Sequence, residues 1–328
     1  QGLTVSDVSS QRAQNHQFQV SVQRQLPWQT VFDMAYVGSR ARKLQVNESI
    51  NALPNEYLAL RDDAARRVTN PFYGLISIGS LSQTTVAKSQ LLLPYPHFGG
   101  ITNIFEPIGS SGYNSLQVSA NKRMQGGLTF LAGYTWAKDM SRRTFLNNYQ
   151  PLERVISQID RTHRFTISGL WEIPVGKGRK LGSNMPTVLN YAVGGWELLW
   201  VTIVDSGVPI GGWSGSIVTG TPRKVDRSID KWFDTSVFGV QPSYTLRTVS
   251  SYFSGIRQDN VKNFDITIGK TFPIWESMKL RFTTQFFNAF NTPQFGAPNT
   301  SVTSAAFGTI TSQANYPRWI QFAGKFEF

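Results

Sequence analysis

The chain has 328 residues, no cysteine and only three histidines, which excludes disulfide-stapled folds and cysteine-based zinc sites. Charged residues make up only 16%, and no stretch approaches the roughly 20 consecutive apolar residues of a membrane-spanning helix. The net charge is +12, but the basic residues form no long block. We therefore interpret them as scattered surface charge and expect no nucleic-acid partner.

Nine segments show the period-2 alternation of apolar and polar residues that is typical of half-buried β-strands. Most are close to the roughly 9–11 residues that a tilted transmembrane strand requires. Segment 194–205 is the least regular, because it carries apolar residues on both sides. In chain order, the nine segments lie at 17–23, 28–37, 113–121, 128–136, 163–173, 194–205, 264–269, 278–286 and 318–328.

The connections between these segments alternate between short and long. Short turns are predicted at 24–28, 124–127 and 273–277, and a link of intermediate length at 174–193. Short turns at one end and long loops at the other are typical of an outer-membrane β-barrel, whereas a compact soluble domain rarely contains several such long loops. We therefore predict one antiparallel, partial barrel domain over 1–328. Its major extracellular loops are predicted at 38–112, 138–160, 206–262 and 291–317.

The two faces of the predicted strands differ in polarity. One face is aliphatic and aromatic, as contact with hydrocarbon demands, and the other is polar, as a watery lumen permits. A soluble sandwich would give the same alternation with the apolar face inward, so contact of Phe18, Phe130, Trp171 and Phe282 in a dry interior would reject the barrel. The predicted lumen-facing residues are Asp33, Gln117, Asn121, Arg281 and Gln285.

The last predicted strand ends the chain on an aromatic residue. Phe322, Phe326 and Phe328 occupy alternate positions, with no polar tail after them. This pattern is similar to the C-terminal signal by which outer-membrane barrels are recognised by the barrel assembly machinery. An ordinary amphipathic edge strand is the alternative interpretation.

Several stretches resemble TonB-dependent outer-membrane receptors, in particular the Oar-like subfamily of acidobacterial type. The resemblance implies a barrel of about 22 strands around an N-terminal plug that contacts TonB. Neither a plug nor a TonB box is evident here, so we expect this chain to be a C-terminal piece of a longer protein, roughly the last two fifths of the barrel wall. The stretches that carry the resemblance are 52–60, 70–74, 90–98, 134–138, 160–165, 174–179, 286–296 and the terminal strand.

Motifs for catalysis, a cofactor or a metal site are weak, and we expect none of the three. Ser119 and Lys122 match an S-x-x-K pattern, but on a strand they point to opposite faces and cannot cooperate. A cluster near position 160 could act as a proton relay, although a salt-bridged anchor of a loop at the barrel rim is the favoured interpretation. Its members are Asp160, Arg161, His163 and Arg164.

Aromatic residues in the long loops have two possible roles. They can stack on a sugar or pack on a peptide ligand, or they can pin the loops into a compact cap. The cap is the favoured interpretation for any single residue. The candidates for ligand contact are Trp213, Trp232, Tyr244 and Tyr95.

The leading hypothesis for function is a segment of a TonB-dependent transporter in the bacterial outer membrane that takes up a scarce solute of unknown kind. Its expected partners are outer-membrane lipid and lipopolysaccharide, the assembly machinery, and TonB through the plug region. A passive porin-like channel and a soluble carbohydrate-binding sandwich are the alternatives. In isolation the chain should form an open, curved sheet that does not insert as a stable barrel, because its first strand leaves an unpaired edge.

Overall fold

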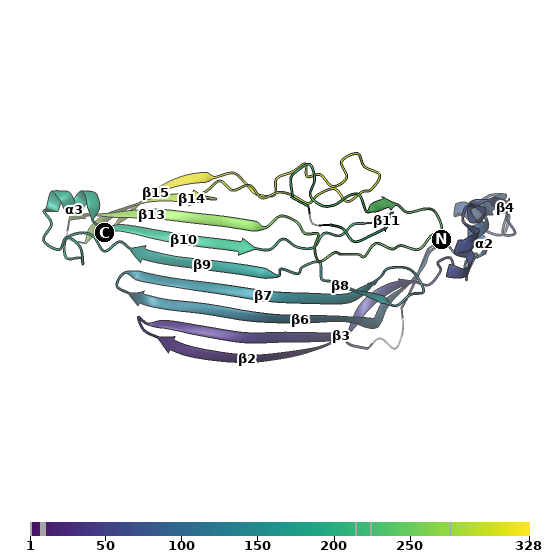
Figure 1. Ribbon diagram of the computed structural model, residues 1–328, viewed down its shortest axis with the longest axis horizontal. Helices are drawn as coiled ribbons and strands as arrows, with labels where there is room; N and C mark the ends of the chain where they lie inside the picture. The colour runs from purple at the N-terminus through teal and green to yellow at the C-terminus, as the bar shows by residue number, and fades with distance from the viewer. Residues whose placement is uncertain (1, 7–10, 214, 224, 276) are drawn as a thin grey trace.

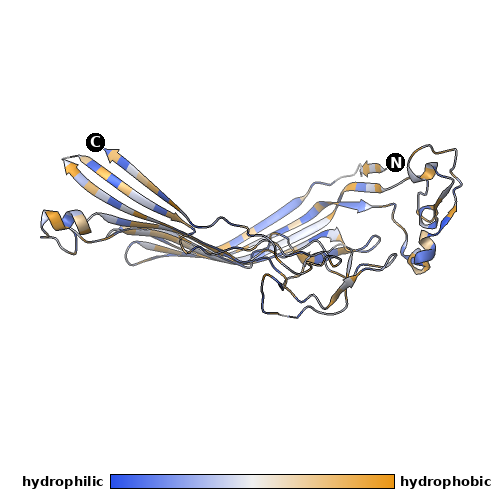
Figure 2. Ribbon diagram, turned by 90° about the horizontal axis from the view of Figure 1, so that it is seen from above, coloured by the Kyte–Doolittle hydropathy of each residue, from blue (hydrophilic) through white to orange (hydrophobic). Residues whose placement is uncertain are grey.

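One curved sheet dominates the structure, a computed structural model that describes residues 2–6, 11–213, 215–223, 225–275 and 277–328. Within these residues eleven strands belong to the sheet, and nine of them follow one path in the order β15-β14-β13-β10-β9-β7-β6-β3-β2. The strands lie side by side in a single layer (Figure 1), and the layer bends along its length (Figure 2). Neighbours on the path pair antiparallel, and its two ends are not joined, so the sheet is open.

The remaining elements are short and lie in the connections or at the sheet margin. β1 (Leu3–Ser6) pairs parallel with β6, and β8 (Leu152–Ile156) pairs with β7. The strands of the path are β2 (Gln14–Leu26), β3 (Thr30–Ser49), β6 (Ile101–Gln125), β7 (Leu128–Phe145), β9 (His163–Glu172), β10 (Trp196–Asp205), β13 (Val261–Trp275), β14 (Met278–Phe287) and β15 (Trp319–Glu327). The other elements are β4 (Arg67–Thr69), β5 (Thr85–Ala87), β11 (Ser216–Val218), β12 (Phe238–Val240), the helices α1 (Asp62–Ala65), α2 (Lys88–Leu91) and α3 (Thr187–Val193), and two 3₁₀ helices (Asn55–Leu60, Gly79–Ser82).

Each of the nine predicted segments overlaps one strand of the path, and the predicted short turns join neighbouring strands at one end of the sheet (Figure 1). Residue 276 in the turn 273–277 lies outside the described residues. None of the helices in the described ranges is long and apolar enough to cross a membrane.

Strand pairing aligns the two predicted faces across the whole sheet. Because side chains alternate between faces, residues paired across strands share a face. Val20 pairs with Tyr36, Tyr36 with Leu116, and Leu116 with Trp136, which makes one apolar row. The polar positions of each strand form the other face. The strand faces that the sequence pattern predicts to be apolar therefore all lie on one side of the sheet.

The apolar face carries a band of exposed aromatic and aliphatic side chains. Phe18 is 44% exposed, Trp171 38% and Phe282 42%. Large rings cover two glycines of this face: a Cβ on Gly38 would overlap the ring of Phe18, and one on Gly169 would overlap the ring of Trp200. Such coverage shields backbone that a glycine leaves bare and fixes the register of the strands. The exposed rings do not meet one another in an interior between two sheets.

Three strands are longer than the alternation predicted. β3 and β6 stay paired, with bulges, as far as the pair Ser49–Thr102, and β7 continues to Phe145. The predicted loop 38–112 is therefore corrected to 50–100, and the predicted loop 138–160 begins with the end of β7 and contains β8. Beyond the apolar band no strand face has to be apolar. The alternation of apolar and polar residues therefore disappears, while the backbone hydrogen bonds between the strands continue.

Two lysines on the apolar face donate hydrogen bonds to backbone carbonyl groups at the end of the sheet where the short turns lie. The Nζ of Lys122 donates to the carbonyl oxygen of Trp28 at 2.7 Å. The Nζ of Lys270 donates to the carbonyl oxygens of Ala192, at 3.2 Å, and Gly194, at the end of α3. Both lysines are nearly buried, so an apolar surface can extend past them.

Candidate functional site

The loops 206–262 and 291–317 fold together into a cap with its own hydrophobic core. Trp213 is at its centre, with its ring stacked on Phe238 at a centroid distance of 4.9 Å and edge-on to Phe233 at 5.2 Å. The short hairpin β11–β12 supplies Phe238. We call this unit the cap; its buried core residues are Ile210, Trp213, Trp232, Phe233, Val249, Ile256 and Ile310.

Two of the predicted ligand-contacting aromatics belong to the core of the cap. Trp213 is 1% exposed and its Nε1 donates to the carbonyl oxygen of Ile210 at 3.0 Å. Trp232 is 5% exposed, its Nε1 donates to the carbonyl oxygen of Arg257 at 2.7 Å, and the Arg227 guanidinium lies 5.3 Å from the ring centre. Both rings are almost wholly covered by the protein, and each borders one of the two hollows described below, so their contact with a ligand stays a prediction. The alternative of a compact cap describes them.

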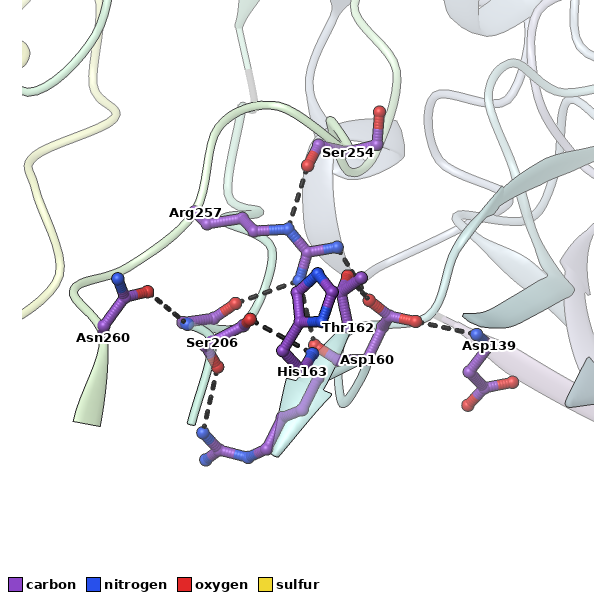
Figure 3. A network of polar contacts seen from close by, with 10 residues as sticks. Asp139, Asp160, Thr162, His163, Ser206, Ser254, Arg257 and Asn260 are labelled. Carbon is purple, nitrogen blue, oxygen red and sulfur yellow. Dashed lines mark hydrogen bonds and ion pairs between the residues drawn. The ribbon is translucent and has the colours of Figure 1, made fainter. Parts of the chain in front are cut away.

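A buried ion pair joins the cap to the sheet. Asp160 lies in the connection between β8 and β9, and its side chain is fully buried. Its Oδ2 accepts from Nη2 of Arg257 in the cap at 2.7 Å, and its Oδ1 accepts from the backbone N–H of Asp139 at 2.7 Å (Figure 3). Arg257 also donates to the carbonyl oxygens of Ser254, at 2.9 Å, and Gly207, at 2.9 Å. The guanidinium thus connects two cap segments to the strand margin.

The remaining members of the predicted cluster around Asp160 point elsewhere. Arg161 and Arg164 lie 3.6 Å and 3.7 Å from the carboxylate of Asp205, on the neighbouring strand. The Nδ1 of His163 lies 2.8 Å from the hydroxyl of Tyr134 on the apolar face. The histidine and Asp160 therefore do not form a relay, and the interpretation as a loop anchor describes the geometry. The sequence pattern did not predict Arg257 as the partner of Asp160, because the two residues are 97 positions apart in the chain.

A hollow of about 600 Å³ lies between the cap and the sheet margin at β7 and β8. The hydroxyl of Tyr252 in the cap donates to Oε1 of Gln158 at 2.9 Å at its edge. Arg143 and Arg247 contribute guanidinium groups, and the Nε of Arg247 is buried with no hydrogen-bond partner among the described residues. The described lining thus holds two guanidinium groups and no carboxylate, so this hollow suits a polar or anionic guest.

A second hollow, of about 760 Å³, lies in the cap and is lined by Arg223, Arg227 and aromatic residues. Next to it, Asp234 accepts from the hydroxyl of Ser236 at 2.6 Å and from the backbone N–H of Arg223 at 3.0 Å. These hydrogen bonds, that of Ser236 first, hold the pKa of the Asp234 carboxyl below its ordinary value. The segment of the cap beside this hollow is thus held in place by hydrogen bonds to the ionised carboxylate of Asp234.

Tyr95 and Tyr244, the other two predicted ligand contacts, lie at neither hollow. Tyr95 is 46% exposed in the loop 50–100. The hydroxyl of Tyr244 lies 3.4 Å from Oγ of Ser89 and thereby links the cap to that loop. The structure does not bring the four predicted aromatics together at one site.

The five predicted lumen-facing residues share one face of the sheet. Asp33 pairs with Ser119, and Gln117 and Asn121 lie two residues on either side of Ser119, hence on the same face. Near the other end of the sheet path, Gln285 pairs with Thr267 of β13. The side chain of Arg281 on β14 forms an ion pair with Glu197 on β10, reaching over β13. The residues of this face that sequence reasoning missed as partners are Glu197 and Asp205, both on the irregular strand β10.

Catalytic or metal-binding geometry is not found at these positions. In the ranges that the structure describes, no group of three histidine, aspartate or glutamate side chains could hold a metal ion. Ser119 pairs with Gly133 and lies on the polar face, whereas the nearly buried Lys122 pairs with Thr30 and Phe130 and lies on the apolar face. The S-x-x-K pattern therefore brings no nucleophile and base together.

Comparison with known proteins decides the class of the sheet. A family model described as an outer membrane beta barrel domain matches residues 1–321. The chain belongs to the outer membrane β-barrel domain family. Among solved structures, the outer membrane transporter YddB from Escherichia coli is similar, with a TM-score of 0.48 and 9% identity. All of this chain aligns with 34% of that one, so it spans about a third of its length, and no curated protein matches the chain.

Membership of the outer membrane β-barrel domain family places the chain in the outer membrane and assigns the environment of its two faces. In such domains apolar side chains face lipid and polar ones face the interior. The band that contains Phe18, Trp136 and Phe282 therefore faces hydrocarbon, and the soluble sandwich is wrong. The cap packs against the opposite face, since Trp213 and Tyr252 of the cap share a hollow with Ser141 of β7, which pairs with Ser111 on the polar face.

The last strand of this outer membrane β-barrel domain is an open edge with exposed rings. Phe322 is 66% exposed, Phe326 48% and Phe328 94%. Phe322 stacks on Phe282 of β14 at a centroid distance of 6.1 Å, so it lies on the lipid-facing side. Phe326 pairs with Leu280, so it shares this side, and both rings lie along the edge where a neighbouring strand would add.

Proposed function

We propose that this outer membrane β-barrel domain supplies barrel wall and extracellular loops to a TonB-dependent transporter that takes up a scarce solute. The observation that carries the proposal is the cap, which is folded, anchored to the barrel rim through Asp160 and Arg257, and packed on the polar side of the wall. A solute arriving from outside meets the cap before it reaches the polar face. The hollow with Arg143, Arg247 and Tyr252 is the proposed capture site.

The proposed role is transport without catalysis. The resemblance to Oar-like receptors supports a barrel of about 22 strands, a plug inside it and energy supplied by TonB. In this scheme the face with Asp33, Gln117, Asn121, Arg281 and Gln285 lines the lumen around the plug and the passing solute. The barrel assembly machinery recognises the last strand through Phe322, Phe326 and Phe328, and nucleic acid is not a partner.

Uptake measurements in the native host test the proposal. Cells lacking the gene are compared with cells carrying it for growth on, and uptake of, a panel of sugar oligomers, peptides and iron chelates. Saturable uptake that stops when the proton gradient or TonB is removed is the expected result. Diffusive uptake that persists after either treatment would instead identify a passive porin-like channel and overturn the proposal.

A further inference from the structure

Four exposed arginines converge on the lipid-facing side of the wall near the extracellular end. Arg40 and Arg42 lie on β3, Arg142 on β7 and Arg154 on β8, and together they line a hollow of about 260 Å³. Arg42 and Arg142 pair with the same residue, Ser110, from its two sides. Strand pairing thus places these two arginines, which are far apart in the chain, at the same level along the strands.

The position of this arginine cluster relative to the apolar band follows from its contacts. Arg40 lies two positions beyond Gly38, and its guanidinium is 5.8 Å from the ring centre of Phe18. Its Nη2 donates to Oδ1 of Asn114 at 2.7 Å, which also accepts from the hydroxyl of Tyr36 at 2.9 Å. Arg40 is four residues beyond Tyr36, or about 13 Å along the strand. The cluster therefore begins where the aromatic band ends, on the same face.

The charge of the cluster is not balanced within the described part of the chain. The ion pairs found there use other basic residues, and none joins Arg40, Arg42, Arg142 or Arg154 to a carboxylate. Lys138, exposed one row nearer the band, adds a further positive charge to this face. Like charges held this close repel each other, so the arrangement favours an anion. The planar fork of arginine suits phosphate oxygens in particular.

We propose that these four arginines bind the phosphates of a lipid A-type glycolipid in the outer leaflet. The long-loop end of an outer membrane β-barrel faces outward, where the phosphorylated glycolipid headgroups lie. Acyl chains then run along Tyr36, Leu116 and Trp136 while the phosphates reach the arginines above them. A soluble anion has no acyl chains and would make no contact with the apolar band below the hollow. The inference uses the outer-membrane assignment and does not depend on what is transported.

The test compares two variants of the protein, each produced with its complete reading frame and purified from outer membranes in mild detergent. One carries Arg42→Gln with Arg142→Gln, and the matched control carries Lys177→Gln with Lys180→Gln at the short-turn end, so both lose two charges. Arg40 is kept because it also bonds the strands together. Heat-modifiable migration on a gel establishes that each variant is folded.

Binding is measured for diphosphoryl lipid A, dephosphorylated lipid A, phosphatidylglycerol and inorganic phosphate. We expect diphosphoryl lipid A to bind the arginine variant about tenfold more weakly than the wild type or the control, as loss of charge-assisted bonds predicts. The other three probes should bind weakly to all proteins. Equal affinity of wild type and arginine variant for diphosphoryl lipid A overturns the proposal, and so does phosphatidylglycerol or phosphate binding as tightly as lipid A.

Discussion

The carboxylate of Asp160 and the guanidinium of Arg257 meet at 2.7 Å, although 97 residues separate them in the chain. The aspartate belongs to the sheet margin and the arginine to the cap. Both side chains are almost completely covered, and each makes further hydrogen bonds to backbone groups. This pair is a buried charged link between the part of the domain that spans the membrane and the part that meets the outside.

Removing one partner of this pair should loosen the cap without unfolding the sheet. In an Asp160→Ala variant the Arg257 guanidinium stays buried without its counter-charge, which costs roughly 3–5 kcal/mol. We expect faster amide hydrogen exchange in 206–262 and unchanged exchange in β7 and β10. As a control, Arg66→Gln removes an exposed partner of Asp63 and should change the exchange very little. Unaltered cap protection in Asp160→Ala would contradict the anchoring role.

The core of the cap should depend on Trp213 as a protein interior does. Its ring is enclosed by Phe233, Phe238 and Phe253. Trp213→Ala should therefore lower the free energy of cap unfolding by about 3–5 kcal/mol, because it removes a large side chain and leaves a cavity. Limited proteolysis of the purified protein measures the effect as cleavage within the cap. Trp275→Ala, at a ring that is 70% exposed, is the control, and equal cleavage of the two variants would refute the prediction.

The strands could be predicted from the sequence because their signal is local. Period-2 alternation is visible within ten residues, and the lipid-facing band extends it to nearly every strand of the wall. The ends of β3 and β6 could not be placed this way, because the apolar requirement ends where Arg40 and Arg42 begin. The contacts of the cap were also out of reach: a loop tryptophan such as Trp213 has the same local pattern whether it is buried or exposed. Only the pairing of distant segments decides between the two.

The cap should also lose stability in acid through Asp234. Hydrogen bonds from Ser236 and from the backbone hold the pKa of this carboxyl below its ordinary value. The unfolded carboxyl titrates near pH 4, at about 3.9, so the bonds stabilise the folded cap fully above that pH. The stabilisation is lost as the pH falls from about 4 through the lower pKa of the folded state. Near-ultraviolet circular dichroism of the packed tryptophans measures the change.

The matched variant for this acid response is Asp234→Asn. It retains the shape of the side chain and removes the titrating group, so the acid response below about pH 4 should shrink while the signal between about pH 5 and 8 stays flat. The same acid response in wild type and variant would show that another group is responsible.

The edges of the sheet determine how the 328 residues behave when they are produced alone. Every residue of β2 is exposed, as are nearly all of β15, and the two strands do not pair with each other. Unpaired backbone groups are not tolerated in hydrocarbon, so this sheet needs further strands to close. We expect the isolated chain, refolded into detergent or lipid, to migrate identically on a gel with and without boiling. The complete protein from outer membranes should migrate faster unboiled. A compact, protease-resistant, heat-modifiable band from the isolated chain would show that β2 and β15 can meet and close a smaller barrel.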